Sequence, residues 1–177
     1  MPKWASGPTG YPSYWRRAKK ELSNVDPVMA DIIKGCGYGG LIGQGDPFVT
    51  LVRSIVGQQI SVRAADSIWN RLEETAGGVS PKNVAARDEI ELHGAGLTRR
   101  KASYIRDIAV AFLDGGVAPS MWNEKDDEGV IAELMGLRGI GRWTAEMFLI
   151  FHLLRPNVLP LDDIGLIRAC ERHYAAG

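Results

Sequence analysis

Proline follows a capping residue at three places in the chain, and these dipeptides constrain the fold more than any other feature. They are Asp26-Pro27, Asp46-Pro47 and Ser80-Pro81. Proline fits the first position of a helix because an N–H group there would have no partner, while the preceding Asp or Ser oxygen accepts from an orphan amide. Each dipeptide therefore predicts the start of a helix rather than a turn between strands.

Apolar residues recur at helical spacing along much of the chain. From Phe48 to Val56 they follow the i, i+3, i+4, i+7, i+8 pattern of a helix with one buried face. The stretch from Ile105 to Leu113 repeats this pattern after Thr98, and another amphipathic stretch follows Ser61. No segment alternates with a period of two, so we predict an all-α fold.

The composition is that of a globular protein, with 177 residues of which 45% are hydrophobic and 24% charged. Basic and acidic residues balance at 21 each, so any binding of nucleic acid must rely on local groups rather than net charge. No apolar run reaches the length of a membrane span, and residues 1–7 lack the features of a secretory signal. We therefore expect a cytoplasmic protein. Two cysteines, Cys36 and Cys170, are too few for an iron–sulfur cluster.

The string from Leu134 to Ala145 contains a Gly-x-Gly turn, Gly139-Ile140-Gly141, shortly before a long apolar stretch. Glycines in such a turn bring main-chain N–H groups close to a ligand, and unpaired amides at a helix N-terminus favour an anion. A DNA phosphate fits such a site, and Arg138 and Arg142 could add contacts. A tight helix–helix turn without a ligand is the alternative for this motif taken alone.

Two adjacent aspartates, Asp162 and Asp163, open another expected helix further along the chain. One of them suffices to cap the helix, and the other can face a cleft, where the helix dipole favours its ionised form. An ionised carboxylate in a cleft stabilises an oxocarbenium-like sugar and orients a water molecule, as in glycosyl-bond hydrolysis. No second carboxylate is paired with it as a general acid, which indicates a leaving group that departs with little protonation.

Together these motifs resemble the helix–hairpin–helix DNA glycosylase superfamily. The resemblance rests on the turn at 139–141, the residues 142–145 that follow it, and Asp163. The strings at 55–62 and 97–102 narrow it to the 3-methyladenine DNA glycosylase II branch. It implies base-excision repair by hydrolysis of the N-glycosidic bond of alkylated purines, such as 3-methyladenine, in double-stranded DNA.

The resemblance also implies two helical lobes with a cleft between them. The first lobe would combine residues 12–45 with residues 163–177, and a glycine-rich segment at 35–45 marks its boundary. Residues 46–162 would form the second lobe, which carries the hairpin. The family usually continues with further helices beyond this point, so we expect a first lobe that is incomplete at its C-terminus, with an open side to the base pocket.

Roles of single residues follow from the resemblance. Asp163 is the catalytic carboxylate, and Asp162 is its neighbour that caps the helix or orients water. Trp143 stands where strand-cutting members carry a lysine, and an indole has no nucleophilic amine, so a monofunctional enzyme is expected. With Met147 one turn later, Trp143 lines the base pocket and can stack on a cationic base for roughly 0.5–2 kcal/mol. Because the best-known member has a tyrosine in place of Met147, the preferred base stays open.

Gln58 and Gln59 match the loop that fills the duplex after base flipping, and Gln59 is the better match for the inserted residue. The alternative is that both are solvent-facing loop glutamines. The hairpin of the family commonly holds a monovalent cation, Na⁺ or K⁺, through backbone carbonyls, here those of Leu137, Gly139 and Ile140. No cofactor is required otherwise, and we expect a monomer.

Two other hypotheses compete with a glycosylase. The first is a non-catalytic helix–hairpin–helix module that binds DNA, but negative charge at Asp162 and Asp163 would repel the phosphate backbone and gain such a module nothing. The second is an α-helical interaction domain without a role on DNA, which only the neutral net charge supports.

Overall fold

The computed structural model describes residues 11–37, 39–43 and 45–174, and the regular structure within these ranges is helical. They contain no strand, so the predicted all-α class is confirmed. The elements are, in chain order, α1 (Trp15–Val25), α2 (Pro27–Gly35), α3 (Pro47–Gly57), α4 (Val62–Ala76), α5 (Pro81–Ala85), α6 (Glu89–Gly94), α7 (Arg99–Asp114), the 3-10 helix η1 (Pro119–Met121), α8 (Asp127–Met135), α9 (Arg142–Phe151) and α10 (Ile164–Tyr174). Among the residues described, no helix has both the length and the hydropathy that crossing a bilayer requires.

The three proline dipeptides begin helices as predicted. The Asp46 carboxylate accepts from the Val49 amide at 2.9 Å to cap α3, and Asp26 and Ser80 cap α2 and α5 in the same way. Thr98 caps α7, which ends at Gly115 in the left-handed conformation. Each cap replaces an orphan amide–water contact and stabilises its helix by about 1 kcal/mol.

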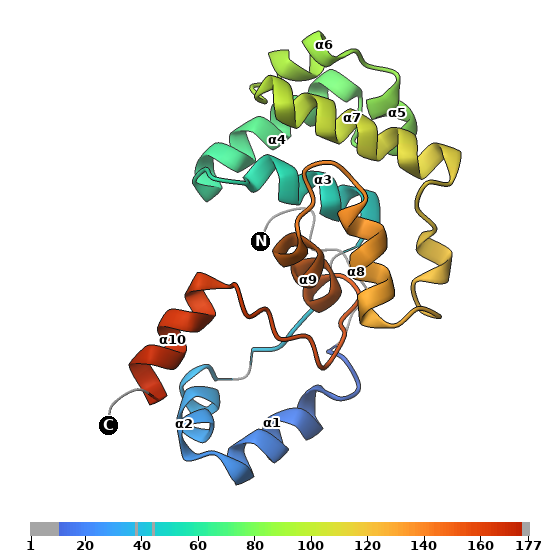
Figure 1. Ribbon diagram of the computed structural model, residues 1–177. Helices are drawn as coiled ribbons and strands as arrows, with labels where there is room; N and C mark the ends of the chain where they lie inside the picture. Colours follow the sequence, from blue (N-terminus) through green and yellow to red (C-terminus); the bar gives the residue numbers. More distant parts are fainter. Residues whose placement is uncertain (1–10, 38, 44, 175–177) are drawn as a thin grey trace.

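Helix α3 occupies the centre of the main helical body, between α4–α7 and the pair α8 and α9 (Figure 1). The five apolar residues at the predicted spacing, Phe48, Leu51, Val52, Ile55 and Val56, are all buried. An edge-to-face series of aromatic rings joins α3 to α7 and α9 through Phe48, Phe112, Trp122 (directly after η1) and Phe148. The core therefore fixes α9, which follows the hairpin, directly against α3.

Helices α1, α2 and α10 lie apart from this body, at the lower side of Figure 1. None of the three has a buried residue. The Tyr174 hydroxyl of α10 donates to the Asp26 carboxylate at 2.6 Å, so the last described helix contacts the N-cap of α2. The lobe boundaries stay a prediction, and residues 38, 44 and 175–177 of the expected first lobe lie outside the described residues.

Candidate active site

The turn at Gly139–Gly141, called the hairpin from here on, joins α8 to α9 and is anchored by apolar side chains. Leu137 and Ile140 are both buried, and the Ile140 amide donates to the Leu137 carbonyl at 3.1 Å. Gly141 is the N-cap of α9 and offers no capping side chain, and the first turn of α9 holds no acidic residue. The amides that begin α9 are therefore not occupied by a side-chain cap, and the positive end of the helix dipole favours an anion there.

Gly139 is the residue of this turn that must be glycine. Its φ is +89°, and a Cβ built on it would lie 2.3 Å from the Tyr104 ring. The Tyr104 ring, on α7, therefore packs directly against the backbone of the turn. The Arg138 guanidinium lies 5.3 Å from the centre of the same ring and pairs with Asp107 at 2.9 Å. Helix α7 thus backs the hairpin and orients one arginine beside it.

The two predicted arginines, Arg138 and Arg142, differ in how strongly they are bound by carboxylates of the protein. The Arg138 side chain is 67% exposed, and its single surface ion pair is weak enough to be exchanged for a phosphate. Arg142 binds both Glu128 and Glu146, and the side chain of Glu146 is only 9% exposed. Arg142 therefore anchors the start of α9 to α8, and its contact with DNA stays a prediction.

Asp163 uses both oxygens of its carboxylate. Its Oδ1 accepts from the Leu166 amide at 2.7 Å and so caps α10, while its Oδ2 accepts from the Trp143 indole N–H at 2.8 Å. The Leu166 amide and then the indole hold the pKa of the Asp163 carboxyl below its usual value. The prediction that Asp162 caps this helix is wrong, because the cap needs an oxygen near the Leu166 amide and Asp163 supplies it.

Trp143 lines two cavities at once. One, of about 350 Å³, is open beside Asp162, Asp163 and the start of α10. The other, of about 360 Å³, lies between α3 and α9 and is lined by Gln58, Gln59 and Met147 among others. Since 45% of the surface of Trp143 is exposed, its indole presents a face to ligands while its N–H stays bonded to Asp163. The predicted pair Trp143 and Met147 does lie together on one face of α9.

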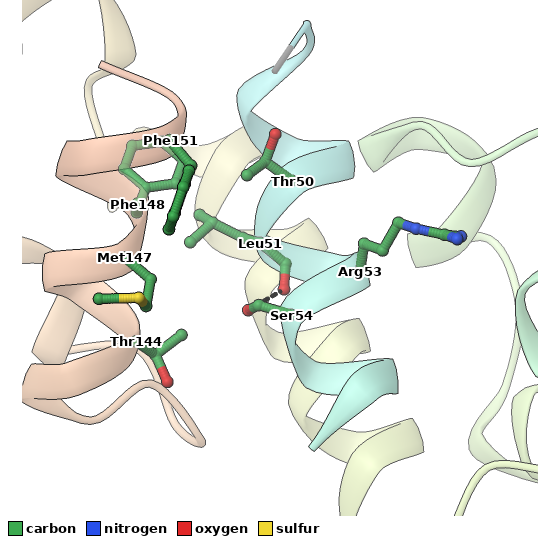
Figure 2. A pocket seen from close by; sticks show the side chains of 8 residues that line it. All are labelled: Thr50, Leu51, Arg53, Ser54, Thr144, Met147, Phe148 and Phe151. Carbon is green, nitrogen blue, oxygen red and sulfur yellow. Dashed lines mark hydrogen bonds between the residues drawn. The ribbon is translucent and has the colours of Figure 1, made fainter. Parts of the chain in front are cut away.

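A further cavity of about 190 Å³ continues along the seam between α3 and α9 (Figure 2). It shares Ser54, Thr144 and Met147 with its neighbour. Apolar side chains dominate its α9 wall, and the Ser54 hydroxyl donates to the Leu51 carbonyl at 2.7 Å. Arg53 points away from α9 in Figure 2. This space suits a flat apolar ring held by few hydrogen bonds.

Residues 58–61, here called the wedge loop, connect α3 to α4. The Gln58 amide group donates to the Gly139 carbonyl at 3.0 Å, so the alternative of two solvent-facing glutamines is wrong for Gln58. Gln59 is exposed, with a φ of +58°. Lys101 of α7 donates to the backbone carbonyls of Val56 and Gln58, and it is the main functional residue that the sequence does not single out. The family string at 97–102 contains Lys101, but the carbonyls that it binds belong to a distant segment, so only tertiary packing reveals them.

Two of the three predicted cation ligands are carbonyls that already accept hydrogen bonds. The Leu137 carbonyl accepts from Ile140 and the Gly139 carbonyl accepts from Gln58, which leaves each oxygen a second lone pair. Such carbonyl oxygens suit a monovalent cation. Within the described ranges no cluster of three or more His, Cys, Asp or Glu side chains could hold a metal. Cys36 and Cys170 are both exposed.

Comparison with known proteins agrees with this arrangement. Residues 52–177 match the HhH-GPD superfamily of base excision DNA repair proteins, and the chain belongs to this family. It is 28% identical to DNA-3-methyladenine glycosylase 1 of Schizosaccharomyces pombe over 89% of this chain, and it spans 66% of that relative. The resemblance inferred from the motifs is thereby confirmed.

Solved structures show the same fold. The DNA-3-methyladenine glycosidase of Bacillus halodurans superposes with a TM-score of 0.79 at 33% identity, over 89% of this chain and 73% of that one. The 3-methyladenine DNA glycosylase Mag1 of Schizosaccharomyces pombe, in complex with abasic DNA, gives 0.79 at 27% identity, over 91% and 82%. The described helices thus have the architecture of this family.

Replacing Gly139 tests the conformation of the hairpin. Gly139→Ala should lower the free energy of unfolding by roughly 1–2 kcal/mol or more, because alanine is strained at a positive φ and its Cβ meets Tyr104. Gly94→Ala is the matched control, since Gly94 ends α6 with open space around it and should be neutral or slightly stabilising. Urea denaturation measures both, and equal stability of the two variants would contradict the account.

Removing the indole N–H tests the electrostatics of Asp163. In Trp143→Phe the pKa of Asp163 should rise toward the ordinary value of about 3.9, but stay below it because the Leu166 amide still donates. The stability that this carboxylate contributes is present above its unfolded pKa and is lost as the pH falls through its folded pKa. In the variant this contribution should be smaller, and its loss should be complete at a higher pH, because the folded pKa lies closer to the unfolded one.

Carbon-13 NMR titration of the Asp163 carboxyl measures this shift directly. Trp15→Phe, on α1, serves as the control and should leave the titration of Asp163 unchanged. An Asp163 pKa that is the same in Trp143→Phe as in the unmodified protein would show that the indole does not stabilise the anion.

Proposed function

We propose that this protein is a monofunctional DNA glycosylase that hydrolyses the N-glycosidic bond of alkylated purines in double-stranded DNA. One observation carries the proposal: the Asp163 carboxylate accepts a hydrogen bond from the indole of Trp143. Trp143 lies in the first turn of α9, the helix that follows the hairpin. The names of the relatives support the substrate class, and abasic DNA, to which one of them is bound, is the product of base removal.

The chemistry follows from a cationic base. A purine alkylated at N3 or N7 carries positive charge and leaves as a neutral molecule when the bond from C1′ to nitrogen breaks, so no general acid is needed. The fixed anion of Asp163 stabilises the oxocarbenium-like sugar that develops, and a water molecule adds its oxygen to C1′ and releases a proton. The exposed indole face of Trp143 gains roughly 0.5–2 kcal/mol by stacking on the charged base.

Binding to DNA in this proposal uses local groups rather than net charge. The amides at the start of α9, with Gly139 and Gly141, hold a phosphate, and Arg138 adds a contact. Gln59 of the wedge loop enters the duplex where the base has left, and the base occupies the cavity beside Met147. Arg142 contributes by keeping the start of α9 in place.

The proposal also covers the oligomeric state of the protein, its location and its need for ions. The protein acts as a monomer on cytoplasmic DNA that contains alkylated bases. It requires no cofactor, and a Na⁺ or K⁺ ion bound by the carbonyls of Leu137, Gly139 and Ile140 would add positive charge near the phosphate. Strand cleavage is excluded from the proposal because Trp143 cannot form a Schiff base.

Exchanging the carboxylate for an amide tests the proposal. Asp163→Asn should lower the single-turnover rate of base release by at least about 100-fold, because the fixed anion is lost. Asparagine caps helices as well as aspartate does, so α10 should remain folded. Affinity for the same duplex should stay equal or rise, since a negative charge near the phosphates is removed. Free 3-methyladenine and 7-methylguanine released from methylated duplex DNA are measured by chromatography.

Asp162→Asn is the matched control, because it removes the neighbouring charge without touching the bonds of Asp163, and it should lower the rate of base release far less than Asp163→Asn does. Undiminished release by Asp163→Asn would remove this residue from the mechanism. An unmodified protein that binds DNA but releases no base would favour the non-catalytic module instead.

A further inference from the structure

We propose that Gln58 and Lys101 position Gln59 for insertion into DNA, and that they join the wedge loop and the hairpin into one unit. The inference rests on the proposed function. Gln58 is then a positioning residue that acts through Gln59 and does not itself enter the duplex. The proposal is carried by the hydrogen bonds of three segments that are far apart in the sequence: the wedge loop, the start of α7 and the hairpin.

The backbone of the wedge loop has an unusual conformation. Gln59 has a φ of +58°, which is unfavourable for a residue with a side chain, and Gln58 leaves α3 in an extended conformation. Such a conformation persists only where its surroundings fix it. The residues on both sides of Gln59 must therefore be held.

Lys101 holds the loop backbone from α7. Its Nζ donates to the Val56 carbonyl at 2.9 Å and to the Gln58 carbonyl at 2.7 Å. These carbonyls end α3, where a cation is favoured by the helix dipole. Lys101 forms no ion pair within the described part of the chain, so its charge is directed at these two oxygens. Burial lowers the pKa of the amine, in agreement with a partly desolvated position.

Gln58 carries the connection on to the hairpin. Its side-chain amide donates to the Gly139 carbonyl at 3.0 Å, and Gly139 in turn packs against the Tyr104 ring. Lys101 and Tyr104 are three residues apart on α7 and so lie on one side of that helix. One face of α7 thereby supports both the loop that enters DNA and the turn that holds the phosphate.

Open space on both sides makes these anchors important. The cavity beside Trp143 and Met147 lies against one side of the loop, and a second cavity of about 530 Å³, lined by Arg100 and Tyr104 among others, lies against the other. Gln58 and Gln59 line both. The loop therefore depends on specific hydrogen bonds rather than on close packing, and its anchored geometry aims Gln59 at a fixed distance from the bound phosphate.

The experiment uses a duplex with a tetrahydrofuran abasic-site analogue and 2-aminopurine opposite it, whose fluorescence reports insertion of a side chain into the gap. Gln59→Ala should abolish most of the change, and Gln58→Met and Lys101→Met should each reduce it. Affinity for the duplex, measured by anisotropy, should change less than threefold in Gln58→Met. Single-turnover base release should fall about tenfold in the same variant, as expected for one lost hydrogen bond.

Two comparisons separate positioning from a general structural role. Gln58→Met should add almost nothing in a Gln59→Ala background, because it acts through Gln59. Lys101→Arg, which keeps donors for both carbonyls, should recover most of the signal that Lys101→Met loses. Lys20→Met, at an exposed position on α1, is the control and should behave like the unmodified protein.

Additive effects of Gln58→Met and Gln59→Ala would overturn the inference, and so would a full fluorescence change in Gln58→Met. The fluorescence readout needs no base release. If the unmodified protein inserts Gln59 but releases no base, the proposed function fails while the positioning role stands. If it releases base and the two substitutions are additive, only the positioning role fails.

Discussion

The hydrogen bond from the Trp143 indole to the Asp163 carboxylate connects the two parts of the site. Trp143 belongs to the first turn of α9, directly after the hairpin, and Asp163 begins α10. Because both oxygens of the carboxylate are held by N–H donors, the anion keeps one orientation and needs little reorganisation when positive charge develops on a sugar. The same helix start that can hold a phosphate therefore also sets the position of the charged group.

Helix α7 supplies a second constraint, since Tyr104 fits against Gly139 and Lys101 holds the end of α3. This explains how a chain with no net charge can belong to a family of DNA repair proteins. The groups that would meet DNA are backbone amides, a polar loop and one accessible arginine, Arg138, and they are arranged by packing rather than by an excess of basic residues. Electrostatic attraction at long range is correspondingly weak.

The sequence predicts the helices well, because caps and apolar periodicity act within a few residues. Asp46 and Thr98 start α3 and α7 where the motifs indicate. The motifs also identify the hairpin, Asp163 and Trp143 as neighbours in one site. What sequence alone could not predict is the partner of each polar group, since several donors compete for each acceptor in three dimensions. Asp163 rather than Asp162 caps α10, and Arg142 is committed to two glutamates.

The central claim is that a fixed anion at Asp163 faces the sugar whose bond is broken. The most direct test compares the affinity for two duplexes, one with a neutral tetrahydrofuran abasic-site analogue and one with a protonated pyrrolidine analogue that carries the positive charge of the oxocarbenium ion. The account predicts that the unmodified protein prefers the cationic duplex by about tenfold or more, the range of a charge-assisted contact, and that Asp163→Asn loses this preference. A preference that survives in Asp163→Asn would contradict it.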